Sequence, residues 1–178
     1  MEIKGQGFSL RGWKVNDAAA LQKHADNINV SSYLFNRFPH PYTMDNAIEW
    51  ISHMMKQDPL LNFVIDVDGS LAGVVGIDLR NDVYQKAPLI GYWLGETYWG
   101  SGIMPQAVKL MVDYTFTHFD IVRLQAGVFS NNPRSMRVLE KAGFVKEGIL
   151  KSAIIKNGII LDEHIYGLVK LSEPGLRD

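Results

Sequence analysis

The chain has 178 residues, of which 47% are hydrophobic and 21% charged, with a formal net charge of −1, which is typical of one globular domain with a core of its own. The near-zero charge excludes a general basic surface for nucleic acid, and the absence of cysteine excludes disulfides, thiolate catalysis and cysteine metal sites. Because neither a signal peptide nor a membrane-spanning apolar run is present, we expect a cytoplasmic protein without a membrane partner.

The first part of the chain predicts a strand followed by a helix. Phe8 and Leu10 alternate with polar residues, which favours an opening strand. The pattern over residues 17–27 predicts a helix, with Asn16 as its N-cap. The next segment, residues 31–42, is rich in aromatic residues and proline, and we expect it to be irregular.

A second helix and a hairpin are predicted next. The helix begins at Thr43 or Asp45, both of which are good N-caps. Its expected apolar side consists of Ala47, Ile48, Ile51 and Met55. Residues 62–67 and 71–79 then read as two strands, because the Asp68-Gly69 pair between them is a strong hairpin turn signal.

A strand, a glycine-punctuated turn and a long helix follow. Residues 88–95 form the predicted strand, and Gly100 and Gly102 form the turn. The helix is indicated by apolar residues at helical spacing: Met104, Ala107, Val108, Met111, Val112 and Phe119. A helix start carries unpaired N–H groups and partial positive charge, and glycine lets backbone amides approach a ligand. This combination suits a pyrophosphate group, and a phosphorylated cofactor is expected here.

The glycine turn is neither of two common nucleotide-binding motifs. No Gly-Lys-Ser or Gly-Lys-Thr follows it, so the phosphate-binding lysine of triphosphate loops is missing. Pro105 occupies the position where a dinucleotide fingerprint needs its third glycine. Taken alone, Gly100 and Gly102 could also be ordinary turn residues, so the assignment depends on a second segment.

That second segment is a short helix after another strand. Residues 124–129 form the predicted strand, Asn132 is a good N-cap, and Pro133 suits the first helical position. Gly143 is a helix stop after which Phe144 can pack back on the last turn. Polar groups at the start of this helix therefore lie at the end of a strand.

The last part of the chain predicts a long hairpin. Residues 145–155 and 159–171 are expected strands, joined by Asn157-Gly158, the strongest short hairpin signal. Residues 172–178 form a polar tail that we expect to be frayed. The order of elements predicts an α+β fold with a mostly antiparallel sheet.

These segments together resemble the GCN5-related N-acetyltransferase (GNAT) family. Gly91-Tyr92-Trp93-Leu94 followed by Trp99-Gly100-Ser101-Gly102-Ile103 is similar to its acetyl-CoA motif, and Asn132-Pro133-Arg134-Ser135 to its second cofactor motif. The closing run with Glu147-Gly148, Asp162 and Tyr166 resembles the RimJ/RimL-like branch, named for ribosomal-protein N-terminal acetyltransferases. The resemblance covers residues 10–171, nearly the whole chain.

The resemblance implies a single domain over residues 3–171, with helices on both faces of the sheet. It also implies that the strand before the glycine turn splays from residues 124–129 and that acetyl-CoA binds in the resulting cleft. The free strand edge would pair with the pantetheine arm, and an amide near Leu94 would face the thioester oxygen. The implied cofactor-binding residues are Trp93, Leu94, Trp99, Gly100, Ser101, Gly102, Ile103, Met104, Asn132 and Ser135.

The implied catalytic residues are Ser135 and Glu96. Leu139 stands where many relatives carry a tyrosine that protonates the departing thiolate, so Ser135 is the first candidate for that role. A solvated helix serine is an equally good interpretation of Ser135. Glu96 could accept a proton from the amine, although an ordinary surface glutamate is the simpler interpretation. The five histidines lack metal-ligand spacing, so no metal is expected.

The implied function is transfer of acetyl from acetyl-CoA to a primary amine by direct attack. The branch suggests the N-terminal α-amine of a protein or peptide. Two alternatives stay open: a small-molecule amine as acceptor, or an acyl-CoA-binding module that has lost its chemistry, as the missing tyrosine at position 139 would allow. The segment around residues 33–42 and the Asn157 hairpin are the expected acceptor walls. A homodimer is left open as an alternative to a monomer.

Overall fold

The computed structural model describes residues 1–170, so the predicted tail and Leu171 lie outside the described residues. The strands are β1 (Glu2–Lys4), β2 (Ser9–Arg11), β3 (Asn62–Val67), β4 (Ser70–Asp78), β5 (Leu89–Leu94), β6 (Arg123–Phe129), β7 (Val145–Lys156) and β8 (Ile159–Val169). The α-helices are α1 (Ala18–Ala25), α2 (Ile28–Ser31), α3 (Met44–Met54), α4 (Ile103–His118) and α5 (Pro133–Lys141). Short 3-10 helices η1 (Val15–Asp17), η2 (Asp82–Tyr84) and η3 (Glu96–Tyr98) complete the described part.

All eight strands belong to one sheet, in the order β1-β2-β3-β4-β5-β6-β8-β7. Every neighbouring pair is antiparallel except β5 and β6, which are parallel. The predicted α+β fold with a mostly antiparallel sheet is therefore confirmed. In residues 1–170, no helix has the length and apolar character that crossing a membrane requires.

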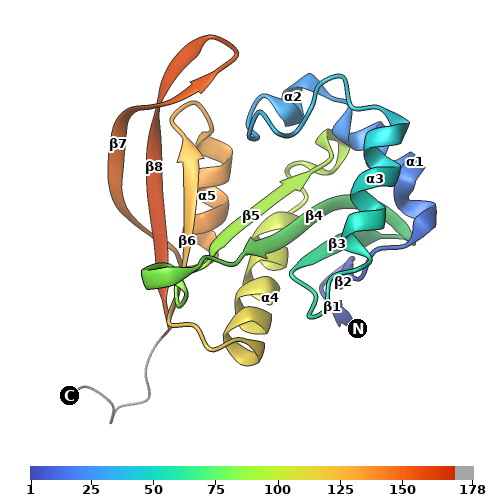
Figure 1. Cartoon of the computed structure of the whole chain (residues 1–178), viewed down its shortest axis with the longest axis horizontal. Helices are drawn as coiled ribbons and strands as arrows, with labels where there is room; N and C mark the ends of the chain where they lie inside the picture. The colour runs from blue at the N-terminus through green and yellow to red at the C-terminus, as the bar shows by residue number, and fades with distance from the viewer. Residues whose placement is uncertain (171–178) are drawn as a thin grey trace.

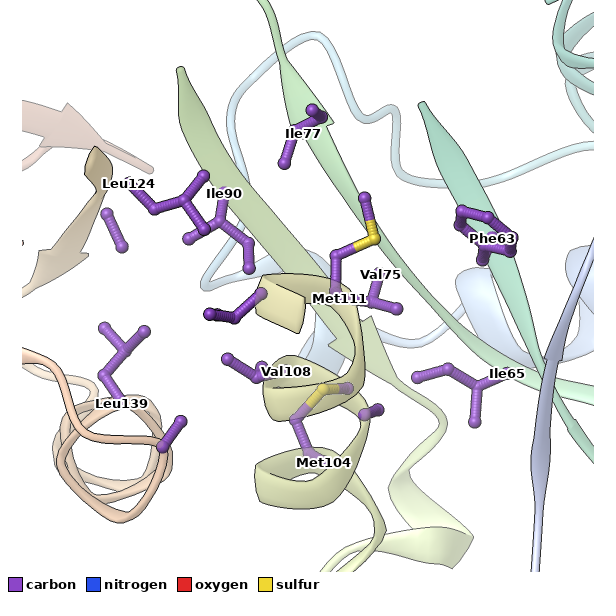
Figure 2. Packing of buried hydrophobic residues seen from close by; sticks show 14 of the residues in the cluster. Phe63, Ile65, Val75, Ile77, Ile90, Met104, Val108, Met111, Leu124 and Leu139 are labelled. Carbon is purple, nitrogen blue, oxygen red and sulfur yellow. The ribbon is translucent and has the colours of Figure 1, made fainter. Parts of the chain in front are cut away.

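Helices cover both faces of the sheet, as expected (Figure 1). One core lies between the sheet and helices α4 and α5, and Figure 2 shows Met104, Val108 and Met111 of α4 within it. The other lies beneath α1 and α3. The period-two pattern of β3 supplies both, because Phe63 belongs to the first core and Val64 to the second.

The N-terminal prediction is wrong in two details. The short strand β1 was not foreseen, and the helix expected over residues 17–27 starts with Asp17 as its N-cap rather than Asn16. The reason is that the Asp17 carboxylate is held by Arg11 (2.7 and 2.8 Å) and by the Lys14 N–H (2.8 Å), which closes η1 first. The helix then stops at Asp26, and Asn27 caps the separate helix α2.

Helix α3 begins after Thr43, one of its two predicted caps, and the Thr43 side chain accepts a hydrogen bond from the Asn46 N–H. Its apolar face differs from the expected one. Ile48 and Met55 are 54% and 51% exposed. The buried residues are Ala47, Ile51 and Met54, because spacings of four and three keep side chains on one stripe of a helix.

The predicted hairpins are both confirmed. Strands β3 and β4 pair around Asp68-Gly69, and β7 and β8 pair around Asn157-Gly158. Asn157 and Gly158 have φ angles of 51° and 76°, the left-handed values that a two-residue hairpin turn requires. The long hairpin of β7 and β8 thereby reaches past the end of β6 (Figure 1).

Candidate active site

The sheet opens between β5 and β6. These two parallel strands share only one register pair, Leu89 with Gln125, and the Gln125 N–H donates to the Pro88 carbonyl at 3.1 Å. Beyond that point they diverge, as Figure 1 shows. The expected splay is therefore present, and the facing edge of β5 is left available for a ligand.

The hydrogen bonds between β4 and β5 determine which backbone groups of β5 face the opening. The N–H of Gly95, which follows β5, donates to the carbonyl of Ala72 on β4, away from the opening, at 2.8 Å. Since bonding alternates along an antiparallel pair, the N–H and C=O groups of Tyr92 and Leu94 point into the opening. The Leu94 carbonyl accepts a hydrogen bond from the Trp99 indole at 2.7 Å. The Leu94 N–H faces the opening, and its expected contact with the thioester oxygen stays a prediction.

The glycine loop lies at the start of α4, a helix of 16 residues. Gly100 and Gly102 have φ angles of 79° and 80°, and a Cβ at either position would have no neighbour within 4 Å. Both glycines therefore have a left-handed backbone conformation and lie next to open space. That space at the helix N-terminus is suitable for a phosphate group. Ile103 and Met104 are buried in the core, so their side chains are not expected to contact a ligand at this helix start.

Helix α5 begins on the other side of the opening. The Asn132 side chain accepts a hydrogen bond from the Ser135 N–H at 3.2 Å, which confirms the predicted cap. Gly143 has a φ angle of 93°, and the Phe144 N–H donates to Leu139 at 3.0 Å. The helix is therefore fixed at both ends.

Ser135 is joined to β5 by a tyrosine whose role was not predicted. The Tyr92 hydroxyl lies 2.9 Å from Ser135 Oγ and donates to the Ser135 carbonyl at 3.2 Å. Burial raises the pKa of Tyr92 well above its ordinary value, so the phenol stays neutral and keeps its proton. Tyr92 was expected only as part of the acetyl-CoA motif, although its strand position places it on the same face as Leu94. Leu139 is fully buried and has no polar group to offer.

Arg134 is a second residue whose role was not predicted from the sequence. Its guanidinium lies 5.1 Å from the centre of the Trp99 ring, a cation–π geometry. Trp99 in turn bonds to Leu94. Helix α5, the glycine loop and the end of β5 are thereby connected around the opening.

Glu96 is held by helix α2. Asn27 Nδ2 donates to one of its carboxylate oxygens at 2.7 Å and Asn29 Nδ2 donates to the other at 2.9 Å. These bonds lower the pKa of Glu96, because they stabilise the ionised form. An exposed carboxylate with both oxygens occupied is a weak base, so the geometry gives the predicted role of Glu96 little support.

The two predicted acceptor walls meet beyond the end of β6. Lys156 Nζ on β7 donates to Asn36 Oδ1 at 3.2 Å, and the rings of Phe35 and Phe129 are 6.4 Å apart, edge to face. Trp93 lies on the side of α1 and α3, 5.9 Å from the Phe38 ring. Residues far apart in sequence therefore line one region at the rim of the opening.

A further carboxylate lies on this side of the sheet. Glu163 is half-buried on β8, paired in register with Phe129, and its side chain lies against Gly127 of β6. A Cβ at Gly127 would overlap that carboxylate, so a larger residue there would displace the Glu163 side chain from its present position. The sequence alone gave no indication of the place of Glu163 beside the opening.

Comparison with known proteins identifies related chains. A family model of the acetyltransferase (GNAT) domain matches residues 8–145. "Probable N-acetyltransferase YjcK" of Bacillus subtilis (strain 168) is 46% identical over 175 residues, which cover 94% of this chain and 96% of that protein. Spermidine N(1)-acetyltransferase of Escherichia coli (strain K12) is 28% identical, with coverage of 79% and 74%. Ribosomal-protein-serine acetyltransferase of the same strain is 31% identical, with coverage of 60% and 59%.

Solved structures agree with the fold. RimL, a ribosomal L7/L12 α-N-protein acetyltransferase in complex with coenzyme A, superposes with a TM-score of 0.82 and 22% identity. The match covers 95% of this chain and 98% of that one. Its arrangement of helices and sheet is the one described above.

Proposed function

The chain belongs to the GNAT acetyltransferase family, and we propose that this N-acetyltransferase acts on the N-terminal α-amine of a protein or peptide. Family membership sets aside the alternative of a catalytically silent acyl-CoA-binding module. The observation that carries the proposal is the opening between β5 and β6, which is flanked by two helix N-termini and leads to a rim between residues 31–42 and the β7–β8 hairpin. This arrangement gives a cosubstrate and an amine separate approaches to one point.

The residues present fit acetyl-CoA as the cosubstrate. The amides at Gly100, Ser101, Gly102, Ile103 and Met104 would hold the pyrophosphate, because they surround the start of α4 and leave open space. The facing groups of Tyr92 and Leu94 would pair with the amides of the pantetheine arm as a neighbouring strand does. The Leu94 N–H would stabilise negative charge on the thioester oxygen.

The reaction needs two proton transfers. The amine nitrogen attacks the thioester carbonyl carbon and loses one proton, the carbon–sulfur bond breaks, and the thiolate takes up one proton. We assign protonation of the thiolate to the Ser135 hydroxyl, which Tyr92 keeps in place through the 2.9 Å contact. For removal of the amine proton, directly or through water, Glu96 remains our candidate, with Glu163 as its competitor.

The weak basicity at this site favours an α-amine as acceptor. An α-amine has a pKa of about 8, whereas a lysine amine has one of about 10.4, so the α-amine needs less help to reach its neutral form. The name of the ribosomal-protein-serine acetyltransferase relative agrees with this choice, and that of the spermidine acetyltransferase relative keeps a small amine as the second candidate.

The test is release of free CoA from acetyl-CoA with a panel of acceptors. The panel contains peptides with free and with formylated N-termini, spermidine, and free amino acids. We expect CoA release with the free peptides and background rates with the formylated ones. Equal rates with both peptide forms, or release with spermidine alone, would overturn the peptide acceptor while leaving the acetyltransferase activity in place.

A further inference from the structure

A small hollow lies at the rim of the opening, next to the end of β6. Its volume is about 130 Å³. It is lined by Leu34, Phe35, Asn36, Phe129, Ala153, Ile154, Ile155 and Lys156. Seven of these eight are neutral, so Lys156 gives the hollow its charge. On the scale of about 30 Å³ for one water molecule, the hollow holds a group the size of a carboxymethyl group with a water.

Lys156 is a buried cation with a neutral partner. The residue is 8% exposed, and its Nζ donates to Asn36 Oδ1. Within residues 1–170, Lys156 forms no ion pair with a carboxylate. An ammonium has three donors, so donors remain for an arriving anion beside the bond to Asn36. Because burial of a cation without a counter-charge is costly, an anion at this place would also stabilise Lys156. Burial also lowers the pKa of Lys156.

The other cations near the hollow already have acidic partners. Arg37, which lies 5.2 Å from the Phe35 ring centre, pairs with Asp78 at 3.1 Å. Lys151, on the same strand as Lys156, pairs with Asp162 at 2.9 Å. Lys156 is therefore the cation of this region that lacks a carboxylate among the described residues.

The opening also has an ordered arrangement of charge. Glu163 lies against Gly127, nearer the closed end of β5 and β6, whereas Lys156 lies beyond Phe129 at the rim. A negative charge inside and a positive charge at the rim match an acceptor whose amine enters first and whose own carboxylate follows. A polyamine, which carries cations throughout, fits this order poorly.

We propose that the hollow around Lys156 is a subsite for a carboxylate that the acceptor carries close to the amine that is acetylated. The proposal rests on the proposed function and deepens it: a peptide acceptor carries an acidic residue next to its N-terminus. The Lys156 ammonium binds that carboxylate, and Asn36 holds the ammonium in position.

The test compares three peptides that differ only in the second residue, which is Glu, Gln or Lys. Each is assayed with the wild-type chain and with the Lys156→Gln, Lys156→Arg and Lys151→Gln variants. Because a hydrogen bond between charged groups is stronger than a neutral one, we expect kcat/KM for the Glu peptide to exceed that for the Gln peptide by about 10- to 100-fold. Lys156→Gln should reduce this ratio to within about 3-fold, and Lys151→Gln should leave it unchanged.

Binding of CoA, followed by its effect on thermal unfolding, shows whether each variant is folded. If Lys156→Gln does not fold, Lys156→Arg carries the test, because it keeps the charge and should keep the preference for Glu over Lys. A wild-type chain without preference among the peptides, or a Glu preference that survives in Lys156→Gln, would overturn the subsite. Small amines with a carboxylate complete the panel. If only these amines are acetylated, and their acetylation depends on Lys156, the proposed peptide acceptor is wrong and the carboxylate subsite is supported.

Discussion

The Tyr92 hydroxyl lies 2.9 Å from Ser135 Oγ, so a side chain from β5 reaches a side chain from α5 across the line along which the sheet opens. This contact fixes the position of the one hydroxyl that the sequence analysis assigned to the departing thiolate. It also explains how Ser135 can serve at a site where Leu139 replaces the tyrosine of many relatives. The phenol of Tyr92 has one proton, which it donates to the Ser135 carbonyl, so its oxygen can accept from the Ser135 hydroxyl and hold that hydroxyl in position.

Ser135→Ala should lower kcat by about 100-fold while leaving CoA binding nearly unchanged, because the hydroxyl acts on the leaving group. Tyr92→Phe should lower kcat by about 10-fold, and the double variant should lose no more than Ser135→Ala alone, because the two groups act as one unit. Steady-state kinetics of the two single variants and the double variant measures these losses of kcat. Tyr114→Phe is the control, since Tyr114 donates to Leu60 away from the opening and its loss should leave kcat unchanged. Additive losses in the double variant would contradict the pairing.

Two carboxylates compete for the role of base, and matched substitutions separate them. The bonds from Asn27 and Asn29 lower the pKa of Glu96, so this carboxylate is ionised across the assay range and cannot set an acidic limb there. We therefore expect the change of kcat/KM with pH near pH 8 to reflect deprotonation of the acceptor amine. Glu96→Gln should lower kcat/KM by the same factor below and above that pH. A larger loss in Glu163→Gln would move the role to Glu163. Unchanged rates in both variants would leave proton removal to water.

Gly102→Asp should abolish binding of CoA, because it places a side chain and a negative charge at the start of α4. The measurement is the rise in the thermal midpoint on adding CoA. Gly69→Asp is the matched control: Gly69 has a φ angle of 82°, close to the 80° of Gly102, but lies in the β3–β4 turn. Both variants share the backbone strain, and only Gly102→Asp should lose the rise. A normal response to CoA in Gly102→Asp would place the pyrophosphate elsewhere.

His24 should make stability depend on pH. Burial, with a smaller effect of Lys23, lowers the pKa of His24 below its usual 6.5. As the pH falls through about 6.5, the unfolded chain binds a proton that the folded chain does not, so the free energy of unfolding decreases by up to about 1.4 kcal/mol per pH unit. Denaturant titrations between pH 5 and 8 should show a flatter profile in His24→Gln than in the wild type. An equal slope in His24→Gln and in the wild type would contradict this account of His24.

Features that depend on neighbouring residues could be predicted from the sequence. The Asn132 cap, the Gly143 stop and the Asn157-Gly158 turn each follow from local backbone conformation, and each is present. The opening itself was predicted through the family resemblance, because both motifs flank it. The start of α1 was predicted one residue too early. Asp17 is held by a hydrogen bond from Arg11, and the local helix pattern does not contain that contact.

Contacts between distant residues could not be predicted. Tyr92 and Ser135 are 43 positions apart, and Lys156 and Asn36 are 120 apart. Each pair depends on strand register and on how far the β7–β8 hairpin extends past β6. Register shifts within β7, between Lys146 and Gly148 and between Leu150 and Ile154, alter which side chains face the hollow. Period-two reasoning cannot locate such shifts: the first places one extra residue in β7 and changes the face of the residues that follow, and the second places two extra residues there.

The most direct test of the account is where the acetyl group is placed on a peptide that has both a free α-amine and a lysine side chain. The peptide is incubated with acetyl-CoA and the wild-type chain, with Ser135→Ala as the comparison, and the product is mapped by fragmentation mass spectrometry. We predict a single acetyl group on the α-amine, formed rapidly by the wild type and slowly by the variant. Acetylation of the lysine side chain alone, or no peptide product under conditions where spermidine is acetylated, would contradict the account.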